Sequence, residues 1–279
     1  IASPAASGAD GSDPGIHLWD AVSGECQRRT LKGLRHDVTH VAFSPDGRTL
    51  ATWNYEDAFI ALWDAVTWCR KATLQAPVEG PRSVAFSPHS RTMAAAGRTD
   101  GGIPLWDVQS GCPRPALKGH SGEVWTVAFS ADNRSVCKLA SGSNDCTIRL
   151  WDVDEGSQLL CLRGHRRRVQ CVAFSSEGGT IVSYSLDETI CLWDAASGVC
   201  SSRFCLTTDA GPVCLSMAFS PDGTTMARAD DFVKSIRVWQ LASSKRSSRE
   251  GAEEAPRHPA APRSTSASIL EGSDCRWLL

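Results

Sequence analysis

Short apolar and alternating segments separated by turn residues follow one another along the chain, without the residue spacing of an amphipathic helix. Between residues 119 and 162 the pattern predicts four β-strands, at Val124–Ser130, Val136–Ser141, Thr147–Trp151 and Gln158–Leu162. The segments between them, rich in Asp, Asn and Gly, are typical of turns. A four-stranded sheet of this size cannot bury both of its faces, so it must stack against further copies of itself.

A Trp-Asp pair marks one position of each copy. It occurs at Trp19, Trp63, Trp106, Trp151 and Trp193, and a sixth copy has Trp239 followed by Gln240. The steps between these tryptophans are 44, 43, 45, 42 and 46 residues. A second motif, Ala-Phe-Ser, begins at Ala42, Ala85, Ala128, Ala173 and Ala218, and its Phe precedes the next of these tryptophans by 19 to 22 residues. Two motifs in step over five periods predict a repeat architecture over residues 1–240.

Four complete copies are expected, at residues 36–74, 80–117, 119–162 and 164–204. The first copy has Ile1–Ser3, 16–20 and 25–31 and lacks its innermost strand, whereas the last, from about Gly211 to Gln240, lacks its outermost strand. About six sheets are therefore predicted, with the first and the last incomplete. Because open sheet edges expose unpaired backbone groups, we expect this chain to be a fragment of a seven-sheet ring; the alternative is a closed ring of six.

The third complete copy resembles the WD40 family. Residues 119–152 contain Gly-His, then Val-x-x-Val-Ala-Phe-Ser, then Leu-Ala-Ser-Gly-Ser, and finally Thr-Ile-Arg-Leu-Trp-Asp. The resemblance covers about residues 1–240 and implies an all-β fold, the WD40 β-propeller, in which four-stranded blades stand radially around a channel. Segments such as Trp193–Cys200 are most similar to repeats of vegetative-incompatibility proteins of the NACHT–WD type, although the chain has no Gly-x4-Gly-Lys-Ser/Thr motif for nucleotide binding.

The resemblance also implies a buried, hydrogen-bonded tetrad of His, Ser, Asp and Trp in a blade. Two copies match it fully, with His120, Ser141, Asp145 and Trp151 in one and His165, Ser183, Asp187 and Trp193 in the next. An Asp-His-Ser set can also be interpreted as a catalytic triad. We favour the structural interpretation, because a buried indole N–H needs an acceptor. Other copies are eroded, and counting back from the Asp puts Trp53 and Ala96 at the Ser positions of the first two complete copies.

Loops at one face of such a ring carry the candidate binding residues. The family positions that follow Gly-His and precede the tetrad Asp are occupied here by Asp37, Glu56, Thr99, Trp125, Asn144, Arg166, Arg167 and Leu186, which we call the candidate face. The basic segment Arg163–Arg168 overlaps it. Such a cluster suits an acidic peptide or a phosphate, and the alternative is a solvated loop.

Charge and cysteine content narrow the partners and the compartment. The net charge is −2, and leaving out the six basic and five acidic residues of 241–279 gives the repeat region −3, which argues against a nucleic-acid partner. No apolar run is long enough to span a membrane, no spacing suits a metal site, and no cofactor or small-molecule substrate is expected. The cysteines at matching repeat positions, Cys26, Cys69, Cys112 and Cys200, are expected to be small buried side chains.

These features favour a non-enzymatic scaffold that binds peptides or domains of other proteins, in the cytoplasm or nucleus rather than outside the cell. One alternative is the regulatory or sensor region of a larger NACHT-type signalling protein. The other is a propeller enzyme, which would need convergent polar side chains at the channel mouth. Residues 241–279 hold eight Ser, six Ala and three Pro, a composition that predicts a disordered tail.

Overall fold

The fold is described from a computed structural model. The structure describes residues 2–5, 15–20, 22–31, 34, 37–54, 56–76, 79–98, 100–131, 137–205, 214–220, 225–230 and 235–240. Thr99 and the predicted tail, residues 241–279, lie outside the described residues. Within these ranges every regular element is a β-strand, and there is no helix with the length and apolarity that a membrane crossing requires.

The strands form six antiparallel sheets, four with four strands and two with three. The first sheet contains β1 (Ala2–Ala5), β2 (Gly15–Trp19) and β3 (Cys26–Thr30). The second contains β4 (His40–Phe43), β5 (Thr49–Trp53), β6 (Phe59–Asp64) and β7 (Arg70–Gln75). The third contains β8 (Glu79–Phe86), β9 (Thr92–Arg98), β10 (Ile103–Asp107) and β11 (Pro113–Leu117).

The remaining three sheets follow the same order. The fourth contains β12 (Val124–Phe129), β13 (Lys138–Ser143), β14 (Thr147–Asp152) and β15 (Ser157–Arg163). The fifth contains β16 (Val169–Phe174), β17 (Thr180–Ser185), β18 (Thr189–Asp194) and β19 (Cys200–Cys205). The sixth contains β20 (Cys214–Phe219), β21 (Thr225–Asp230) and β22 (Ser235–Gln240). The predicted strands of each copy are confirmed, with boundaries that shift by a few residues.

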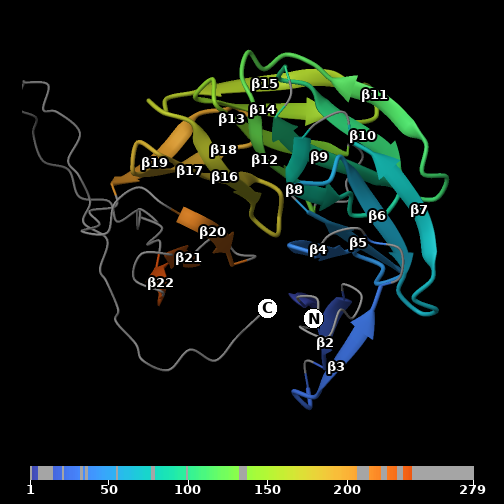
Figure 1. The fold of residues 1–279 in the computed structure, drawn as a ribbon. Coiled ribbons are helices and arrows are strands. Elements are labelled where there is room, and N and C mark those ends of the chain that lie inside the picture. Colours follow the sequence, from blue (N-terminus) through green and yellow to red (C-terminus); the bar gives the residue numbers. More distant parts are fainter. Residues whose placement is uncertain are drawn as a thin grey trace, which may run out of the picture.

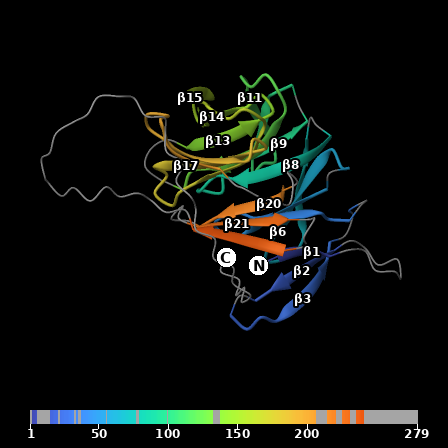
Figure 2. The same cartoon turned by 90° about the vertical axis from the view of Figure 1, so that its left-hand side faces the viewer.

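The sheets lie side by side in chain order along an arc, with the first strand of each complete sheet innermost and the fourth outermost (Figure 1). The view turned by 90° shows the outer strands β11 and β15 at the top and the inner strand β8 closer to the middle (Figure 2). This radial stacking is a β-propeller arrangement, and the predicted fold class is confirmed.

The hydrophobic core lies between neighbouring sheets. One buried cluster joins Ile148 and Leu150 of the fourth sheet to Val172, Ile181 and Trp193 of the fifth. A second joins the third sheet to Trp151 of the fourth, and two further clusters hold Trp106 and Trp63 in the same way. Each repeat tryptophan of a complete sheet therefore packs toward the sheet that precedes it, and no sheet buries its apolar faces alone.

The Asp of each Trp-Asp pair closes the turn into the outermost strand. The Oδ1 atom of Asp64 accepts hydrogen bonds from the amides of Val66 at 3.0 Å and Thr67 at 2.8 Å. Asp194 accepts the amides of Ala196 and Ser197 in the same manner. These bonds stabilise the carboxylate form and lower the pKa of both aspartates. The recurrence of Asp after Trp thus follows from the backbone amides that this turn leaves without partners.

Side-chain hydroxyls connect the innermost strands of adjacent sheets. The amide of Val127 in β12 donates to Ser83 Oγ of β8 at 3.3 Å, and the amide of Val172 in β16 donates to Thr126 Oγ1 of β12 at 3.3 Å. An innermost strand is a sheet edge, so one row of its amides lacks a strand partner. The hydroxyls of Ser83 and Thr126 satisfy two of these amides and fix the spacing of three sheets.

Replacement of Thr126 by Val is expected to reduce the free energy of unfolding by about 1–3 kcal/mol, because it leaves the amide of Val172 buried without an acceptor. The side chain keeps its volume, so the packing loss is small. Urea unfolding followed by circular dichroism measures the change. The same substitution at Thr73, which is exposed on β7, is expected to cost less than about 0.5 kcal/mol. Equal losses at the two positions would show that the hydrogen bond of Thr126 to β16 does not stabilise the fold.

The cysteine prediction is wrong in one respect. Cys26, Cys69, Cys112 and Cys200 are exposed rather than buried. They lie at or next to the beginning of the outermost strand of a sheet, and such a strand has few neighbours on its outer side. These four cysteines are free and belong to four different sheets.

Candidate functional site

The fourth sheet assembles a continuous chain of hydrogen bonds from β13, β14, the turn between them and the segment before β12. Trp151 Nε1 donates to Ser141 Oγ at 2.8 Å, and Ser141 Oγ lies 2.8 Å from His120 Nε2. His120 Nδ1 lies 2.8 Å from Asp145 Oδ2. The indole N–H can only donate, and the carboxylate can only accept. This direction assigns the histidine proton to Nδ1, so every group in the chain is satisfied.

The fifth sheet repeats the chain with a closer histidine–threonine contact than that of the fourth sheet, where His120 Nδ1 lies 3.4 Å from Thr147 Oγ1. Trp193 Nε1 donates to Ser183 Oγ at 2.8 Å, and Ser183 Oγ lies 2.8 Å from His165 Nε2. His165 Nδ1 is shared between Asp187 Oδ2 at 3.3 Å and Thr189 Oγ1 at 3.0 Å. The structure thus brings both predicted tetrads together within hydrogen-bonding distance, the second with a longer His–Asp contact.

Burial decides between the structural and catalytic interpretations of these tetrads. Ser141 and Ser183 are fully buried, with no exposed surface. Each serine oxygen is already engaged by an indole N–H and a histidine nitrogen. A nucleophilic serine has to reach a substrate carbonyl beside an oxyanion site. Burial and these two hydrogen bonds therefore place each serine to join strands of the fourth and fifth sheets, and not to reach a substrate.

The strand register corrects the expectation for the other sheets. Where a hydroxyl group accepts the hydrogen bond of the repeat Trp, its residue pairs across the sheet with the residue two positions before that Trp. In the second sheet this residue is Thr52, which pairs with Ala61. Trp63 Nε1 donates to Thr52 Oγ1 at 2.9 Å, so Trp53 is not at the Ser position. Asp57 follows Thr52 by five residues, whereas Asp145 follows Ser141 by four. Counting four residues back from Asp57 therefore gives Trp53 instead of Thr52. The same register puts Ala95 rather than Ala96 at this position of the third sheet.

The first sheet shows the same contact in an exposed setting. Ser3 pairs with His17, two residues before Trp19. Trp19 Nε1 donates to Ser3 Oγ at 3.1 Å, but the Trp19 side chain is 41% exposed. The hydrogen bond therefore follows from the register alone, whereas burial of the indole requires a preceding sheet.

A Ser-x-Asp-x-Thr motif supports both tetrads and was missed by the sequence analysis. Thr147 Oγ1 donates to Asp145 Oδ1 at 2.6 Å, and Thr189 Oγ1 donates to Asp187 Oδ1 at 2.6 Å. Two residues before each Asp, a buried serine hydroxyl accepts the amide of the Asp and donates to a carbonyl of the segment before the innermost strand. The motif stands at residues 143–147 and again at 185–189, so its recurrence was a visible signal.

Burial and hydrogen bonding shift the pKa values of the tetrad groups. Burial by itself would raise the pKa of Asp145, but hydrogen bonds from His120 and Thr147 outweigh it and hold the pKa well below its usual range. The pKa of Asp187 is also lowered, because bonds from Thr189 and the amide of Arg166 outweigh its burial. Burial lowers the pKa of His165, and the nearby carboxylate of Asp187 offsets only part of this effect.

The free energy of unfolding is expected to fall as the pH is lowered from about 7. The folded pKa of His165 lies below the value of about 6.5 for an unfolded chain, so the unfolded chain binds the proton first. Stability is therefore lost as the pH falls through the interval between these two pKa values. Asp145 and Asp187 contribute in a lower window, because their stabilisation is present above about pH 4 and is lost below it. Urea unfolding at a series of pH values measures both windows.

The variant His165→Gln isolates the upper window. It is expected to reduce the pH dependence between about pH 6.5 and pH 5. Part of the dependence should remain, because burial also lowers the pKa of His40. An unchanged pH dependence in His165→Gln would contradict the assignment.

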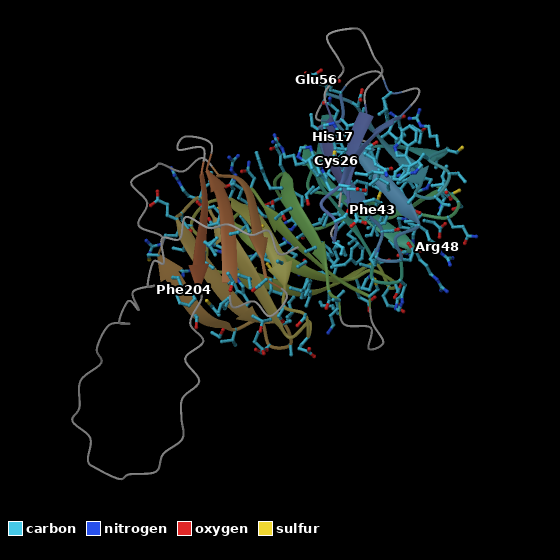
Figure 3. All side chains as sticks on the ribbon, turned by 90° about the horizontal axis from the view of Figure 1, so that it is seen from below. His17, Cys26, Phe43, Arg48, Glu56 and Phe204 are labelled. Atoms are coloured by element: carbon cyan, nitrogen blue, oxygen red, sulfur yellow. The ribbon has the colours of Figure 1, made fainter. Side chains whose placement is uncertain are left out.

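The candidate face lies at one end of the sheets, where the chain enters each innermost strand and where the second strand turns into the third. Backbone bonds join these two segments: the amide of Asn144 donates to Glu123 O at 2.8 Å, and that of Leu186 donates to Arg168 O at 3.1 Å. In the second sheet, Glu56 lies at this end and Arg48 at the opposite end (Figure 3). Glu56, Asn144, Arg166 and Arg167 are exposed, whereas Asp37, Trp125 and Leu186 are half-buried.

Trp125 has surroundings that the sequence did not reveal. The guanidinium groups of Arg82 and Arg168 each lie 3.8 Å from the centroid of its ring. Arg168 was expected only as part of a basic loop, and Arg82 was not predicted at all. The other predicted face residues are grouped by sheet, with Asp37 and Glu56 in the second and Arg166, Arg167 and Leu186 in the fifth.

Stacked four-stranded sheets, joined by buried indoles, define this chain as a β-propeller protein. The WD40 family model, described as "WD domain, G-beta repeat", matches residues 25–64, 68–107, 111–152 and 156–194. These matches cover more than half of the chain, and the chain belongs to the WD40 family. WD40 repeats generally serve as protein-interaction scaffolds. Among the described residues, no group of three or more His, Cys, Asp or Glu side chains is placed to hold a metal ion.

Proposed function

We propose that this chain is a non-enzymatic scaffold that binds peptides or domains of other proteins through the candidate face. The observation that carries the proposal is the grouping of exposed polar residues and the half-buried Trp125 at one end of the hydrogen-bonded sheets. Family membership supports the same function. We expect the chain to act in the cytoplasm or nucleus. We expect its partners to be proteins, with no nucleic acid, membrane, cofactor or small-molecule substrate involved.

The loops of the candidate face are fixed before any partner arrives. Ser143 Oγ donates to Gly122 O at 3.0 Å, and Ser185 Oγ donates to Arg167 O at 2.9 Å. In the second sheet, Asn54 Nδ2 donates to Asp37 O at 2.5 Å. A surface that is already ordered loses little conformational entropy on binding. The candidate face is therefore suited to bind a flexible peptide without rearranging itself.

Selection of short random peptides by the full chain tests this function. The chain is expected to enrich a set of peptides, and the triple variant Trp125→Ala, Arg166→Ala, Arg167→Ala should bind the selected peptides at least about tenfold more weakly, equivalent to about 1.4 kcal/mol. The control variant Arg48→Ala, Arg91→Ala removes two exposed arginines from the turns at the opposite end of the sheets. It should bind like the natural chain. A failure to enrich any peptide, or equal binding by the triple variant, would reject the proposal.

We propose as a second candidate function the regulatory region of a larger NACHT-type signalling protein, the interpretation that the sequence of segments such as Trp193–Cys200 favours. This candidate requires a nucleotide-binding motif upstream in the same reading frame. Sequencing the complete transcript tests it, and a reading frame without such a motif would reject it. In that case, binding of a partner at the candidate face would regulate the larger protein, whereas a scaffold would hold several partners together.

A further inference from the structure

Trp125 is stacked between two arginines that come from different sheets. Arg82 belongs to β8 of the third sheet, Trp125 to β12 of the fourth, and Arg168 directly precedes β16 of the fifth. Each guanidinium carbon lies 3.8 Å from the centroid of the Trp125 ring. Two guanidinium groups cannot occupy that position over one face of the ring, so they lie on opposite faces. We call these three residues the Arg–Trp–Arg stack.

Irregular strand pairing occurs at Trp125 and in the segment that contains Arg82. The pairing of β12 with β13 shifts its register between Val124 and Thr126, which leaves Trp125 as the extra residue. The pairing of β8 with β9 shifts between Glu79 and Ser83, in the segment that contains Arg82. A bulge of this kind points a side chain away from the regular pleat. The shared position, four residues before the Phe of Ala-Phe-Ser, therefore places Arg82 and Trp125 at the same level of adjacent innermost strands.

The Arg–Trp–Arg stack holds two positive charges close together on either side of one ring. Among the described residues, the Nε atoms of Arg82 and Arg168 and Nε1 of Trp125 are buried without a hydrogen-bond partner, and all three side chains are half-buried. Burial and the charge of Arg82 lower the pKa of Arg168, and Glu123 counteracts only part of this effect. Two positive charges held close together in a partly desolvated site are unfavourable. An anion placed beside the stack would relieve this cost.

We propose that the Arg–Trp–Arg stack binds an oxyanion carried on a peptide side chain, either a carboxylate or a phosphate, as the acidic anchor of the partner peptide. The inference rests on the proposed function and names the chemistry of its ligand. Guanidinium groups bind both oxyanions through paired N–H bonds. Stacking on the indole holds the guanidinium planes in place, so less side-chain entropy is lost when the anion binds.

Two further observations favour a peptide as the carrier of the anion. Arg166 and Arg167 are exposed and lie one and two residues before Arg168 on the same segment, so a peptide with several acidic residues can extend from the stack along a second positive surface. The repeat region is net negative as a whole, with −3 from sequence arithmetic (29 basic and 31 acidic residues, less six and five in 241–279). Long-range attraction therefore does not favour binding of a polyanion such as a nucleic acid to the repeat region as a whole, and a local contact with an acidic peptide fits better.

The test compares peptides selected by three forms of the full chain. The natural chain is expected to enrich Asp and Glu in its peptides, and Arg82→Gln, Arg168→Gln should lose that enrichment. The control Arg48→Gln, Arg91→Gln removes the same charge from turns at the opposite end of the sheets and should keep it. In solution, an enriched acidic peptide should bind Arg82→Gln, Arg168→Gln at least about tenfold more weakly than the natural chain. A Glu-to-phosphoserine peptide should also bind, whereas its Glu-to-Gln counterpart should not.

Thermal unfolding of each variant separates loss of binding from loss of folding. If Arg82→Gln, Arg168→Gln unfolds, Arg82→Lys, Arg168→Lys takes its place, because it keeps both charges but not the planar stacked groups, and reduced binding by this folded variant is still expected. Equal losses in the stack and control variants, or no preference for acidic peptides, would overturn the inference while the proposed function stands. Binding of free phosphate as tightly as the peptide would overturn it as well. Selection of no peptide at all would instead reject the proposed function.

Discussion

Replacing Trp151 with Ala is expected to lower the free energy of unfolding by about 3–5 kcal/mol, the range for removal of a buried Trp or Phe. The indole is 1% exposed and lies in the cluster that joins the fourth sheet to the third. The change leaves a cavity between two sheets and removes the donor that Ser141 Oγ accepts. Urea unfolding measures the loss.

Trp19→Ala is the matched control for this prediction. Trp19 occupies the same repeat position and donates a hydrogen bond to a serine hydroxyl, as Trp151 does, but it is 41% exposed. Its replacement is expected to cost about 1 kcal/mol or less. Similar losses for the two variants would show that burial between sheets is not the source of the stability of the fold.

His120→Ala is expected to cost about 1–3 kcal/mol for each buried group that it leaves without a partner. The imidazole joins Ser141 to Asp145, so its removal takes away the hydrogen bond of Ser141 Oγ to Nε2 and the bond from Nδ1 to the Asp145 carboxylate at the same time. The cost should exceed that of Thr126→Val. Combining His120→Ala with Ser141→Ala should show a coupling energy of about 0.5–3 kcal/mol, because the two side chains belong to one network.

His89→Ala tests the specificity of that result. His89 is exposed in the turn between β8 and β9, and its replacement should change stability by less than about 0.5 kcal/mol. An unfolding transition of His120→Ala that coincides with that of the natural chain would contradict the assignment of the tetrad as a structural fastening.

Much of the fold was predictable because the signal is periodic. The spacing of Trp-Asp and Ala-Phe-Ser set the number and order of the sheets, and each strand followed from its local pattern. The tetrad residues were predictable where the loop lengths agree, as in the fourth and fifth sheets. In the second sheet one extra loop residue moved the count to Trp53, although the register chooses Thr52. Backbone pairing, rather than distance from the Asp, fixes which side chain meets the indole.

The binding surface was harder to predict because it depends on contacts between sheets. Arg82 and Arg168 are far apart in the sequence and meet at Trp125 only where three innermost strands converge. A bulge decides which residue of each strand leaves the sheet, and a strand pattern with a period of two residues does not show where a bulge will occur. The exposed cysteines were not predicted either, since they lie at or next to the beginning of strands that form the outer edges of their sheets.

Hydrogen exchange at the indole N–H groups tests most directly whether the repeat tryptophans join the sheets from within. Labelling tryptophan with ¹⁵N and assigning each signal by substitution allows the rates to be followed one by one by nuclear magnetic resonance. The N–H groups of Trp63, Trp151 and Trp193, which donate to buried hydroxyls, should exchange slowly, and that of Trp19 should exchange quickly. Rapid exchange at Trp151 and Trp193, at the rate of Trp19, would contradict the stacked-sheet arrangement and the buried tetrads together.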